Sequence, residues 1–340
     1  MSFLLDCWYF AGWLAEMEAD GKIVRTIADR NLLIFPDGDG GFSAVLDQCP
    51  HRLVPLSCGQ VEPGRVTCGY HGLQFGRDGA CLHNPHGPVL DALRVQAFPV
   101  VARHDGLWIW LGDASSADPA LIPDLGFIDQ TKETAKSAGY EHIAANYLLC
   151  VDNILDLSHA DYLHPSTLGG GSATRAKSSV SETDDGLRIK WEALDDIVPP
   201  ALATAFPNGR GDVRLRVDWW APGVMKLDFG ASQPGDPAHS GPMTYNAHIM
   251  TPKNAFETHY FFCNSRNFMT DDAAFNSHLQ SMLRATFAGE DKPMLEAQQR
   301  SIGNRDIMDS RPVLLRTDAG SARMRRLLSK RIASEHDIDF

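Results

Sequence analysis

Short apolar runs, each closed by turn residues, fill the chain from residue 22 to residue 112. Runs such as LLIF, SAVL and LWIWL are followed within a few positions by Gly, Asp, Pro or Asn. Brief apolar segments separated by such residues are typical of hairpin-connected strands. The pattern predicts an all-β module in the first third of the chain.

From about Gly139 the pattern changes. A helical period covers 146–164, alternating apolar and polar positions then predict strands, and helical periodicity returns near the end. The predicted strands are 186–193, 213–221, 223–231, 245–252 and 258–268, and the late helices are 272–301 and 323–335. Strands grouped apart from helices predict an α+β fold with an antiparallel sheet. The Asp-, Ser- and Pro-rich segment 113–124 is a plausible boundary, and we expect domains at 1–115 and 116–340.

Composition narrows the class of protein. With 340 residues, 44% hydrophobic and 22% charged, the chain is neither disordered nor fibrous, and its length suggests two domains. A net charge of −12 without an extended basic run argues against nucleic acid as a partner. No apolar stretch approaches the roughly 18 residues of a spanning helix. The N-terminus resembles no signal peptide, and the odd count of seven cysteines points to a reducing cytoplasm and to metal or redox chemistry.

Four of the seven cysteines fall between residues 49 and 81, and two of them pair with histidines. Cys49 and His51 form C-x-H, and Cys68 and His71 form C-x-x-H, each between two predicted strands. A Cys₂His₂ zinc finger groups its cysteines and then its histidines. The interleaved order instead suits a Rieske [2Fe–2S] cluster, in which two thiolates hold one iron and two imidazoles hold the other. A zinc site and a chance arrangement are the alternatives.

Neighbouring residues receive less specific predictions. The thiols of Cys58 and Cys81 lack a matching histidine loop, so we expect them to be buried as small hydrophobic side chains. His83 and His86 are expected in a loop near the cluster, with a role as ligands as the alternative. Glycines 69 and 72 would let main-chain N–H groups approach the cluster sulfurs.

A second group of residues lies in DNILDLSHADYLHP, residues 152–165. Two imidazoles and a carboxylate from elsewhere can form the face that leaves positions open on Fe(II). On a regular helix His159 and His164 would lie roughly 140° apart, so either a π-type bulge aligns them or the helix ends between them, as Pro165 favours. Asp156, three residues before His159, is expected to accept a hydrogen bond from that imidazole through its carboxylate. Histidines in such a helix are often core residues, but a Rieske cluster requires an electron acceptor.

With both groups in view, the chain resembles the Rieske non-haem iron oxygenases, and most closely the branch of vanillate O-demethylase and dicamba monooxygenase oxygenase components. The resemblance runs over nearly the whole length. Its carriers are WYFAG (8–12), CPHRLVPLSCG (49–59), CGYHGLQF (68–75), DNILDLSHADYLH (152–164), SRNF (265–268), EDKPMLEAQQ (290–299) and DAG (318–320). It implies a Rieske domain followed by a helix-grip-like catalytic domain holding a mononuclear non-haem iron.

The resemblance also assigns site residues. It makes His159 and His164 iron ligands and selects Asp291 as the third, which spacing alone does not separate from Glu290 or Glu296.

Further residues receive roles from the same resemblance. It gives Asp156 a bridging role between an iron ligand and the partner subunit's His71, and this requires a ring of subunits, as in a homotrimer. Asn153 matches a position near the iron. His248 aligns with a position that contacts substrate in the dicamba enzyme, although a plain strand histidine is the alternative.

The implied activity is O₂ activation at Fe(II), which O-demethylates a vanillate-like methoxylated aromatic and releases formaldehyde. Other Rieske chemistry, namely ring hydroxylation or dihydroxylation, N-demethylation or methyl hydroxylation, is the main alternative, and an electron-transfer protein is the third. No G-x-G-x-x-G motif opens a βαβ unit, so electrons from NAD(P)H would come through a separate reductase, with or without a ferredoxin. The basic tail could dock an acidic carrier or be a solvated helix face; its members are Arg323, Arg325, Arg326, Lys330 and Arg331.

The substrate pocket is expected between Leu157 and the strands and loops from about Ile197 to Phe268. These segments are apolar, which favours an aromatic substrate. No motif places an arginine or lysine against a substrate carboxylate, so the sequence does not choose among methoxyaromatics.

Overall fold

The computed structural model describes residues 3–310 and 312–336. Contacts divide the chain into two compact units, one of residues 3–124 and one that begins at Leu125 and runs to the C-terminal end. This division falls nine residues after the boundary expected at 115/116, at the end of the Asp- and Pro-rich segment.

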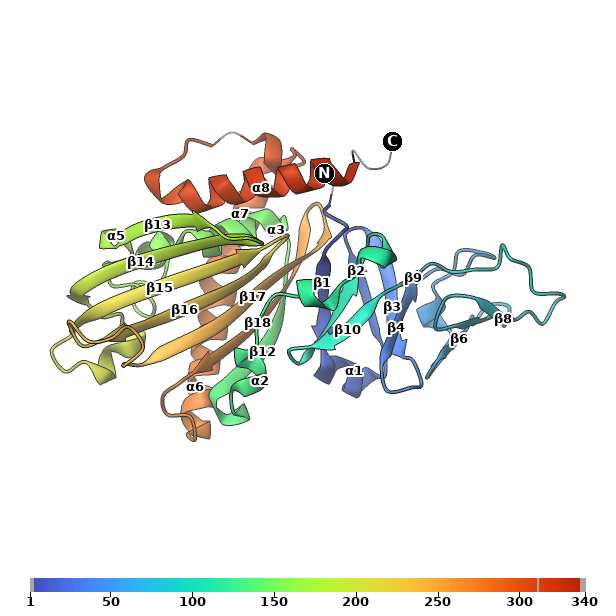
Figure 1. The fold of residues 1–340 in the computed structure, drawn as a ribbon, viewed down its shortest axis with the longest axis horizontal. Helices are drawn as coiled ribbons and strands as arrows, with labels where there is room; N and C mark the ends of the chain where they lie inside the picture. Colours follow the sequence, from blue (N-terminus) through green and yellow to red (C-terminus); the bar gives the residue numbers. More distant parts are fainter. Residues whose placement is uncertain (1–2, 311, 337–340) are drawn as a thin grey trace. The chain divides into compact units, whose positions relative to one another are not determined.

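Short antiparallel strands build the first unit, as the hairpin pattern predicted (Figure 1). One sheet has the order β1-β11-β10, a second β2-β3-β4-β9 and a third β5-β6-β7-β8. The strands are β1 (Trp8–Trp13), β2 (Ile23–Ile27), β3 (Arg30–Pro36), β4 (Phe42–Leu46), β5 (Gln60–Glu62), β6 (Arg65–Thr67), β7 (Gln74–Gly76), β8 (Cys81–His83), β9 (Ala97–Phe98), β10 (Val100–Arg103) and β11 (Gly106–Trp110). The single α-helix of this unit is α1 (Leu14–Asp20), among the described residues.

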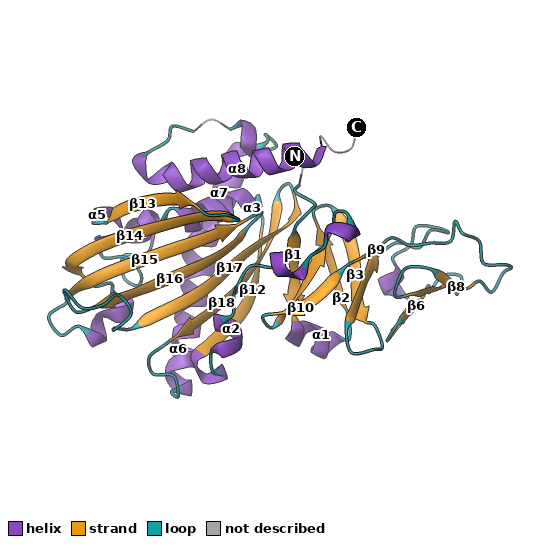
Figure 2. Cartoon of the chain, viewed as in Figure 1, coloured by secondary structure: helices purple, strands orange, loops and turns teal. Residues whose placement is uncertain are grey.

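A seven-stranded antiparallel sheet dominates the second unit (Figure 2). Its order is β12-β18-β17-β16-β15-β14-β13. The strands are β12 (Lys136–Ile143), β13 (Lys177–Glu182), β14 (Gly186–Ile197), β15 (Arg210–Trp220), β16 (Val224–Ser232), β17 (Met243–Asn254) and β18 (Glu257–Arg266). The predicted α+β class is confirmed, and the two edge strands β12 and β13 are additions to the predicted five.

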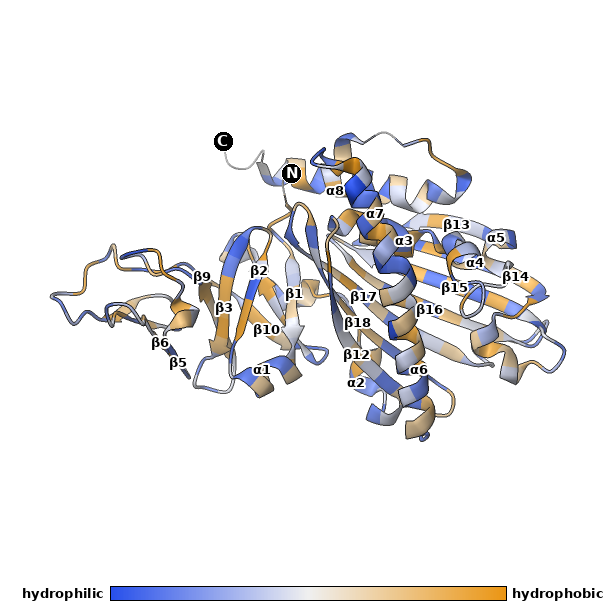
Figure 3. Cartoon of the chain, turned by 180° about the vertical axis from the view of Figure 1, so that it is seen from behind, coloured by the Kyte–Doolittle hydropathy of each residue, from blue (hydrophilic) through white to orange (hydrophobic). Residues whose placement is uncertain are grey.

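Helices α3 (Tyr147–Leu155), α6 (Ala273–Thr286) and α7 (Lys292–Ile302) lie across one face of this sheet (Figure 3). Helix α8 (Ala319–His336) packs on β14 and α3. The shorter helices are α2 (Phe127–Gln130), α4 (Ala160–Leu163) and α5 (Ser172–Arg175). No helix in the described part of the chain is long and apolar enough to cross a membrane.

The helix predicted over 146–164 is interrupted. Asn146 caps α3 by accepting the Leu148 N–H at 2.9 Å, and α3 ends at Leu155 because Asp156 is extended, with φ −124° and ψ 91°. A 3₁₀ turn, Leu157–His159, and the short α4 follow. His164 lies just past α4 in a non-helical conformation before Pro165, so the second of the two alternatives, a helix that ends between the histidines, is correct.

The helix predicted over 272–301 is observed as α6 and α7, joined by a π-helical turn at Phe287–Asp291. Pro293 supplies a reason for the wide turn. It lacks the N–H that would bond the Gly289 carbonyl four residues back, and its ring would clash with that carbonyl in α-helical geometry. A π-type turn relieves both constraints without ending the helix.

Candidate functional site

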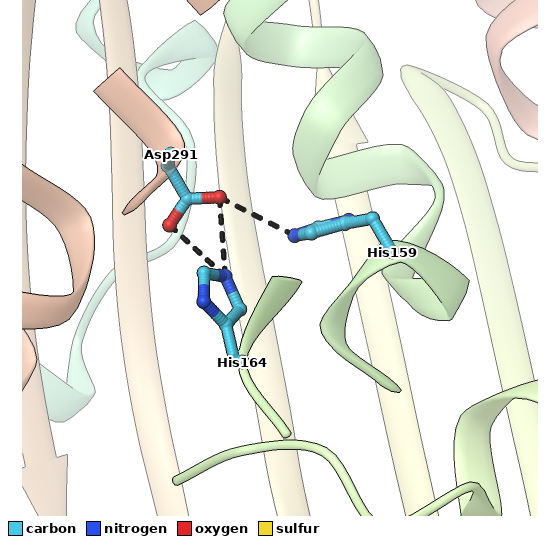
Figure 4. A group of neighbouring side chains, drawn as sticks. All are labelled: His159, His164 and Asp291. Carbon is cyan, nitrogen blue, oxygen red and sulfur yellow. Dashed lines mark hydrogen bonds and ion pairs between the residues drawn. The ribbon is translucent and has the colours of Figure 1, made fainter. Parts of the chain in front are cut away.

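Two histidines and a carboxylate converge on the helical face of the large sheet (Figure 4). His159 ends the 3₁₀ turn, His164 follows α4, and Asp291 ends the π-helical turn. Nε2 of His164 lies 3.1 Å from Asp291 Oδ2, and Nε2 of His159 lies 3.4 Å from Asp291 Oδ1. Among described residues, this is the one group of three donors that could hold a metal with its ligand atoms within 4.8 Å of one another.

Asp156 orients His159, but through a different atom from the one predicted. His159 Nδ1 lies 2.6 Å from the main-chain carbonyl oxygen of Asp156. The Asp156 carboxylate instead accepts hydrogen bonds from the Ser158 N–H at 3.0 Å and the Ser158 hydroxyl at 2.7 Å. The prediction of a carboxylate–imidazole contact was wrong because Asp156 is the N-cap of the 3₁₀ turn, so its side chain turns to the cap.

Each imidazole has an acceptor on its Nδ1. For His159 it is the Asp156 carbonyl, and for His164 it is the Glu290 carboxylate, at 2.5 Å. A proton on Nδ1 leaves the lone pair of each neutral ring on Nε2. Two lone pairs and the Asp291 carboxylate then face one another, which is favourable only with a cation between them. The residues present therefore fit a 2-His-1-carboxylate metal centre.

Electrostatics at this centre favour the same conclusion. Burial raises the pKa of Asp291, but the two facing histidines outweigh it and hold that pKa well below its usual range. Burial lowers the pKa of His164, and the carboxylates of Asp291 and Glu290 outweigh it, so its pKa is raised. Both pKa shifts mean that a positive charge beside Asp291 is favourable.

Asn153 closes the group from α3. Its Nδ2 donates to Asp291 Oδ1 at 3.1 Å and lies 3.4 Å from His159 Nε2. The resemblance placed Asn153 near the iron, and in the structure Asn153 contacts two of the three expected iron ligands.

Replacing Glu290 with glutamine is expected to weaken iron binding about tenfold to 100-fold, because the second partner of a ligating histidine fixes its orientation and basicity. Iron titration of the apoprotein would measure the change. Glu296→Gln is the matched control, because Glu296 lies on the same helix and accepts the Ala144 N–H at 3.1 Å. Equal iron affinity of the Glu290→Gln variant and the parent would contradict the assigned role.

Two adjoining cavities lie between the triad and the sheet. One cavity, of about 110 Å³, reaches His159, His164 and Asp291 and is called the inner cavity here; the other, of about 140 Å³, does not reach them and is called the outer cavity. They share seven lining residues: Leu157, Ala160, Leu168, Leu227, His248, Asn264 and Leu283. The predicted segments, including Leu157 and Pro199–Leu202, contribute to the outer wall, but the face of α6 from Asn276 to Leu283 was not predicted.

His248 lies on β17 and lines both cavities. Its Nδ1 lies 2.6 Å from the Tyr260 hydroxyl on β18, and the two rings stack 6.0 Å apart. Burial lowers the pKa of His248 to about 4, so its imidazole is neutral at physiological pH. Sequence reasoning did not identify Tyr260, which His248 meets diagonally because its direct cross-strand partner is Phe262.

In the first unit, two similar loops carry the Cys/His motifs. The Cys49 N–H donates to the Val54 carbonyl at 2.9 Å, and the Cys68 N–H donates to the Leu73 carbonyl at 2.8 Å, five residues on in both loops. Both thiols are buried on one hydrophobic cluster. The rings of His51 and His71 lie 4.5 Å apart.

The donor spacing fits two irons better than one ion. A tetrahedral zinc, with bonds of about 2.0–2.3 Å, would bring all four donor atoms within roughly 4 Å of one another, and no such group forms here among the described residues. Nδ1 of His71 is buried and has no hydrogen-bond partner in the described part of the chain. Such an atom is suited to be a metal ligand, in agreement with a cluster whose thiolates and imidazoles hold different irons.

Several neighbouring predictions need correction. Cys58 is exposed and Cys81 is half-buried, so neither behaves as the buried hydrophobe that was predicted. Gly69 is required by close approach to the Cys58 carbonyl, which a Cβ would meet at 3.1 Å. His86 lies in a loop, with Nε2 3.0 Å from the His71 carbonyl oxygen, whereas His83 ends β8.

The basic residues of α8 bind their own chain. Arg323 and Arg331 donate to the carbonyls of Val180 and Asp185. Arg326 pairs with Glu182, and Arg325 pairs with Asp152 of α3. These arginines tie α8 to the β13–β14 hairpin and to α3. Arg323, Arg326 and Lys330 are nevertheless exposed, whereas Met324 and Leu328 are buried, which favours the predicted solvated face of an amphipathic helix.

Comparison with known families gives two matches. Residues 7–99 match the Rieske [2Fe-2S] domain, and residues 143–334 match the vanillate O-demethylase oxygenase C-terminal domain. Together they include every residue of the two centres described above.

Whole-chain relatives agree. The chloroacetanilide N-alkylformylase oxygenase component of Rhizorhabdus wittichii is 35% identical, covering 98% of this chain and 97% of the relative. The dicamba O-demethylase oxygenase component of Stenotrophomonas maltophilia is 36% identical, covering 97% and 98%. The crystal structure of dicamba monooxygenase bound to 3,6-dichlorosalicylic acid superposes with a TM-score of 0.89 at 32% identity, covering 99% of each chain.

Proposed function

This chain belongs to the Rieske non-haem iron oxygenases, and we propose that it is the terminal component of a multicomponent monooxygenase that removes the methyl group of a methoxylated aromatic as formaldehyde. Members of this family carry a Rieske cluster and a mononuclear iron. We assign the cluster to Cys49, His51, Cys68 and His71 and the mononuclear iron to His159, His164 and Asp291. The observation that supports this proposal most directly is the pair of adjoining, largely apolar cavities, one of which reaches this triad.

The reaction balances as R–OCH₃ + O₂ + 2 e⁻ + 2 H⁺ → R–OH + CH₂O + H₂O. The iron, when bound, supplies O₂ activation at the positions that three protein ligands leave open. The chain holds the three ligand atoms through Glu290 and the Asp156 carbonyl, and Asn153 keeps the Asp291 carboxylate in place. Leu157, Leu227 and Leu283 line the shared part of the cavities and give it an apolar wall that suits an aromatic substrate and its methyl group.

N-dealkylation is the second candidate. It is favoured by the 35% identity to an enzyme named as an N-alkylformylase of chloroacetanilides. Insertion of oxygen into a C–H bond next to nitrogen gives a carbinolamine, which also collapses with loss of an aldehyde, so the same site serves both reactions.

A single turnover tests the proposal. Holoprotein, chemically reduced without air, is mixed with O₂ and a panel of methoxyaromatics and N-alkylanilides, and formaldehyde and the phenol or amine are measured. This design needs no reductase. Near-stoichiometric formaldehyde with a phenol supports O-demethylation, the same yield with an amine supports N-dealkylation, and substrate-triggered reoxidation of the cluster with a hydroxylated product instead would contradict both.

Electron transfer between subunits forms part of the proposal. We expect a homotrimer in the cytoplasm, fed by a separate reductase or ferredoxin, with Asp156 linking His159 to the partner subunit's His71. Ser158 occupies only Oδ1 of Asp156, and Oδ2 has no hydrogen bond to any described residue.

The substitution Asp156→Asn is accordingly expected to slow steady-state turnover at least about 100-fold while both metal centres load normally. The asparagine keeps the cap acceptor but loses the charge. Turnover with the reductase and iron content per chain are measured together. A variant that turns over like the parent would contradict the bridge. Asp271→Asn is the matched control, because Asp271 is an exposed acidic residue of the same unit that pairs with Lys132.

A further inference from the structure

The proton arrangement of His248 and Tyr260 determines what the cavity offers a substrate. The Tyr260 side chain is buried, and its hydroxyl has one hydrogen-bond partner among the described residues, His248 Nδ1 at 2.6 Å. A buried hydroxyl proton requires an acceptor, so Tyr260 donates to Nδ1. The neutral imidazole then carries its own proton on Nε2.

This Nε2 is buried and has no hydrogen-bond partner in the described part of the chain. His248 lines both cavities, between the triad and the outer wall. A buried donor without a partner is unfavourable, and an acceptor on the substrate would satisfy it.

Charge complementarity is missing from the wall around this donor. Of the residues shared by the two cavities, only His248 and Asn264 are polar. Outside the triad, Arg266 is the one charged side chain lining either cavity among described residues. Its Nη2 donates to the carbonyls of Thr134, Met269 and Asp272, and its Nη1 donates to Asn276, so the guanidinium serves mainly to hold the backbone.

We propose that this site selects an uncharged aromatic substrate whose carbonyl or ether oxygen accepts the Nε2 proton of His248, and that it discriminates against substrates bearing a carboxylate. The inference rests on the proposed dealkylating function and adds the substrate class. A carboxylate in a cavity whose shared wall offers only the neutral polar groups of His248 and Asn264 is poorly compensated for its lost hydration. The outer cavity matches the roughly 150 Å³ that accommodates one benzene ring.

Paired ligands test the inference. Oxidised holoprotein is titrated calorimetrically with 2-, 3- and 4-methoxybenzamide and with the three matching methoxybenzoates. At least one amide is expected to bind at least about 100-fold more tightly than its benzoate. Equal or tighter binding of the benzoates would overturn the inference and point to Nε of Arg266, which is buried and has no hydrogen-bond partner in the described part of the chain. No binding by either series would also overturn the inference.

Variants locate the effect. His248→Leu is expected to weaken amide binding about tenfold, while His248→Gln, which keeps an N–H donor, stays within about threefold of the parent.

Leu227→Arg, which adds a cation to the shared wall, should shift the preference toward benzoates. An unchanged preference in a folded variant would contradict the inference. If a variant fails to fold, Tyr260→Phe is the substitute, and a loss confined to amides is expected. Amide binding without formaldehyde would count against the dealkylating function and leave the selectivity intact.

Discussion

Replacing His159 with alanine is expected to lower turnover at least about 1,000-fold while leaving the visible absorption of the Rieske cluster unchanged. Only His164 and Asp291 would then remain of the triad, and their ligand atoms lie 3.1 Å apart with no third His, Cys, Asp or Glu opposite them among the described residues. The mononuclear iron would be lost, because two ligands do not hold Fe(II) against competing chelators. The cluster residues belong to the other compact unit, so they should load normally.

Iron content per chain, the cluster absorption and product formation in a single turnover would be measured on the same sample. His142→Ala is the matched control, because His142 pairs with Glu257 on β12 and β18 and takes no part in the triad. The experiment also separates an oxygenase from an electron carrier. A variant that lost iron yet kept full activity with its partner proteins would contradict the assignment of the second unit as catalytic.

Cys68→Ser is expected to give the opposite result, with cluster absorption lost and the mononuclear iron kept. The serine oxygen replaces a thiolate in a loop that the Cys68 N–H and the Leu73 carbonyl hold closed. Turnover driven by a reductase should fall to background, since no electrons reach the triad. A decrease in the midpoint temperature of unfolding is also expected, because the Cys68 side chain is 2% exposed and belongs to the core of the first unit.

Cys58→Ser is the control for that variant. Cys58 lies in the same segment but its thiol is exposed, so the cluster should assemble normally. Electron paramagnetic resonance of the reduced protein distinguishes the two variants. Loss of the Rieske signal in Cys58→Ser, or its survival in Cys68→Ser, would show that the ligand assignment is wrong.

Most residues of the two proposed centres could be selected from the sequence because their motifs are local. The C-x-H and C-x-x-H motifs each occupy one loop, and a residue-by-residue pattern is sufficient to find them. The proposed third iron ligand was different: Glu290, Asp291 and Glu296 lie on one helix, and only the resemblance selected Asp291. The π-helical turn explains the difficulty, because it brings the adjacent residues Glu290 and Asp291 to the same histidine, which a regular helix would not do.

Each strand that the sequence pattern failed to predict was missed for its own physical reason. All six residues of β1 are buried, so the strand has no alternation of exposed and buried positions. Strand β13 is a polar edge, five of whose six residues are exposed. Strand β12 contains Gly139, where a Cβ would lie 2.2 Å from the Phe262 ring, so close packing forces a residue of low strand propensity into a strand.

The wide turn at Phe287–Asp291 has a consequence for how this protein can change by insertion or deletion. A one-residue deletion at Gly289, where an added Cβ would meet nothing within 4 Å, would remove the extra residue of this turn and force α-helical geometry, which Pro293 opposes. Glu290 and Asp291 could then no longer both contact His164. Lengthening of the exposed hairpin loops leaves this geometry untouched. Length is therefore as strongly constrained as residue identity in this one stretch of helix, and relatives that align here without gaps are the ones in which the position of the third ligand can be read directly.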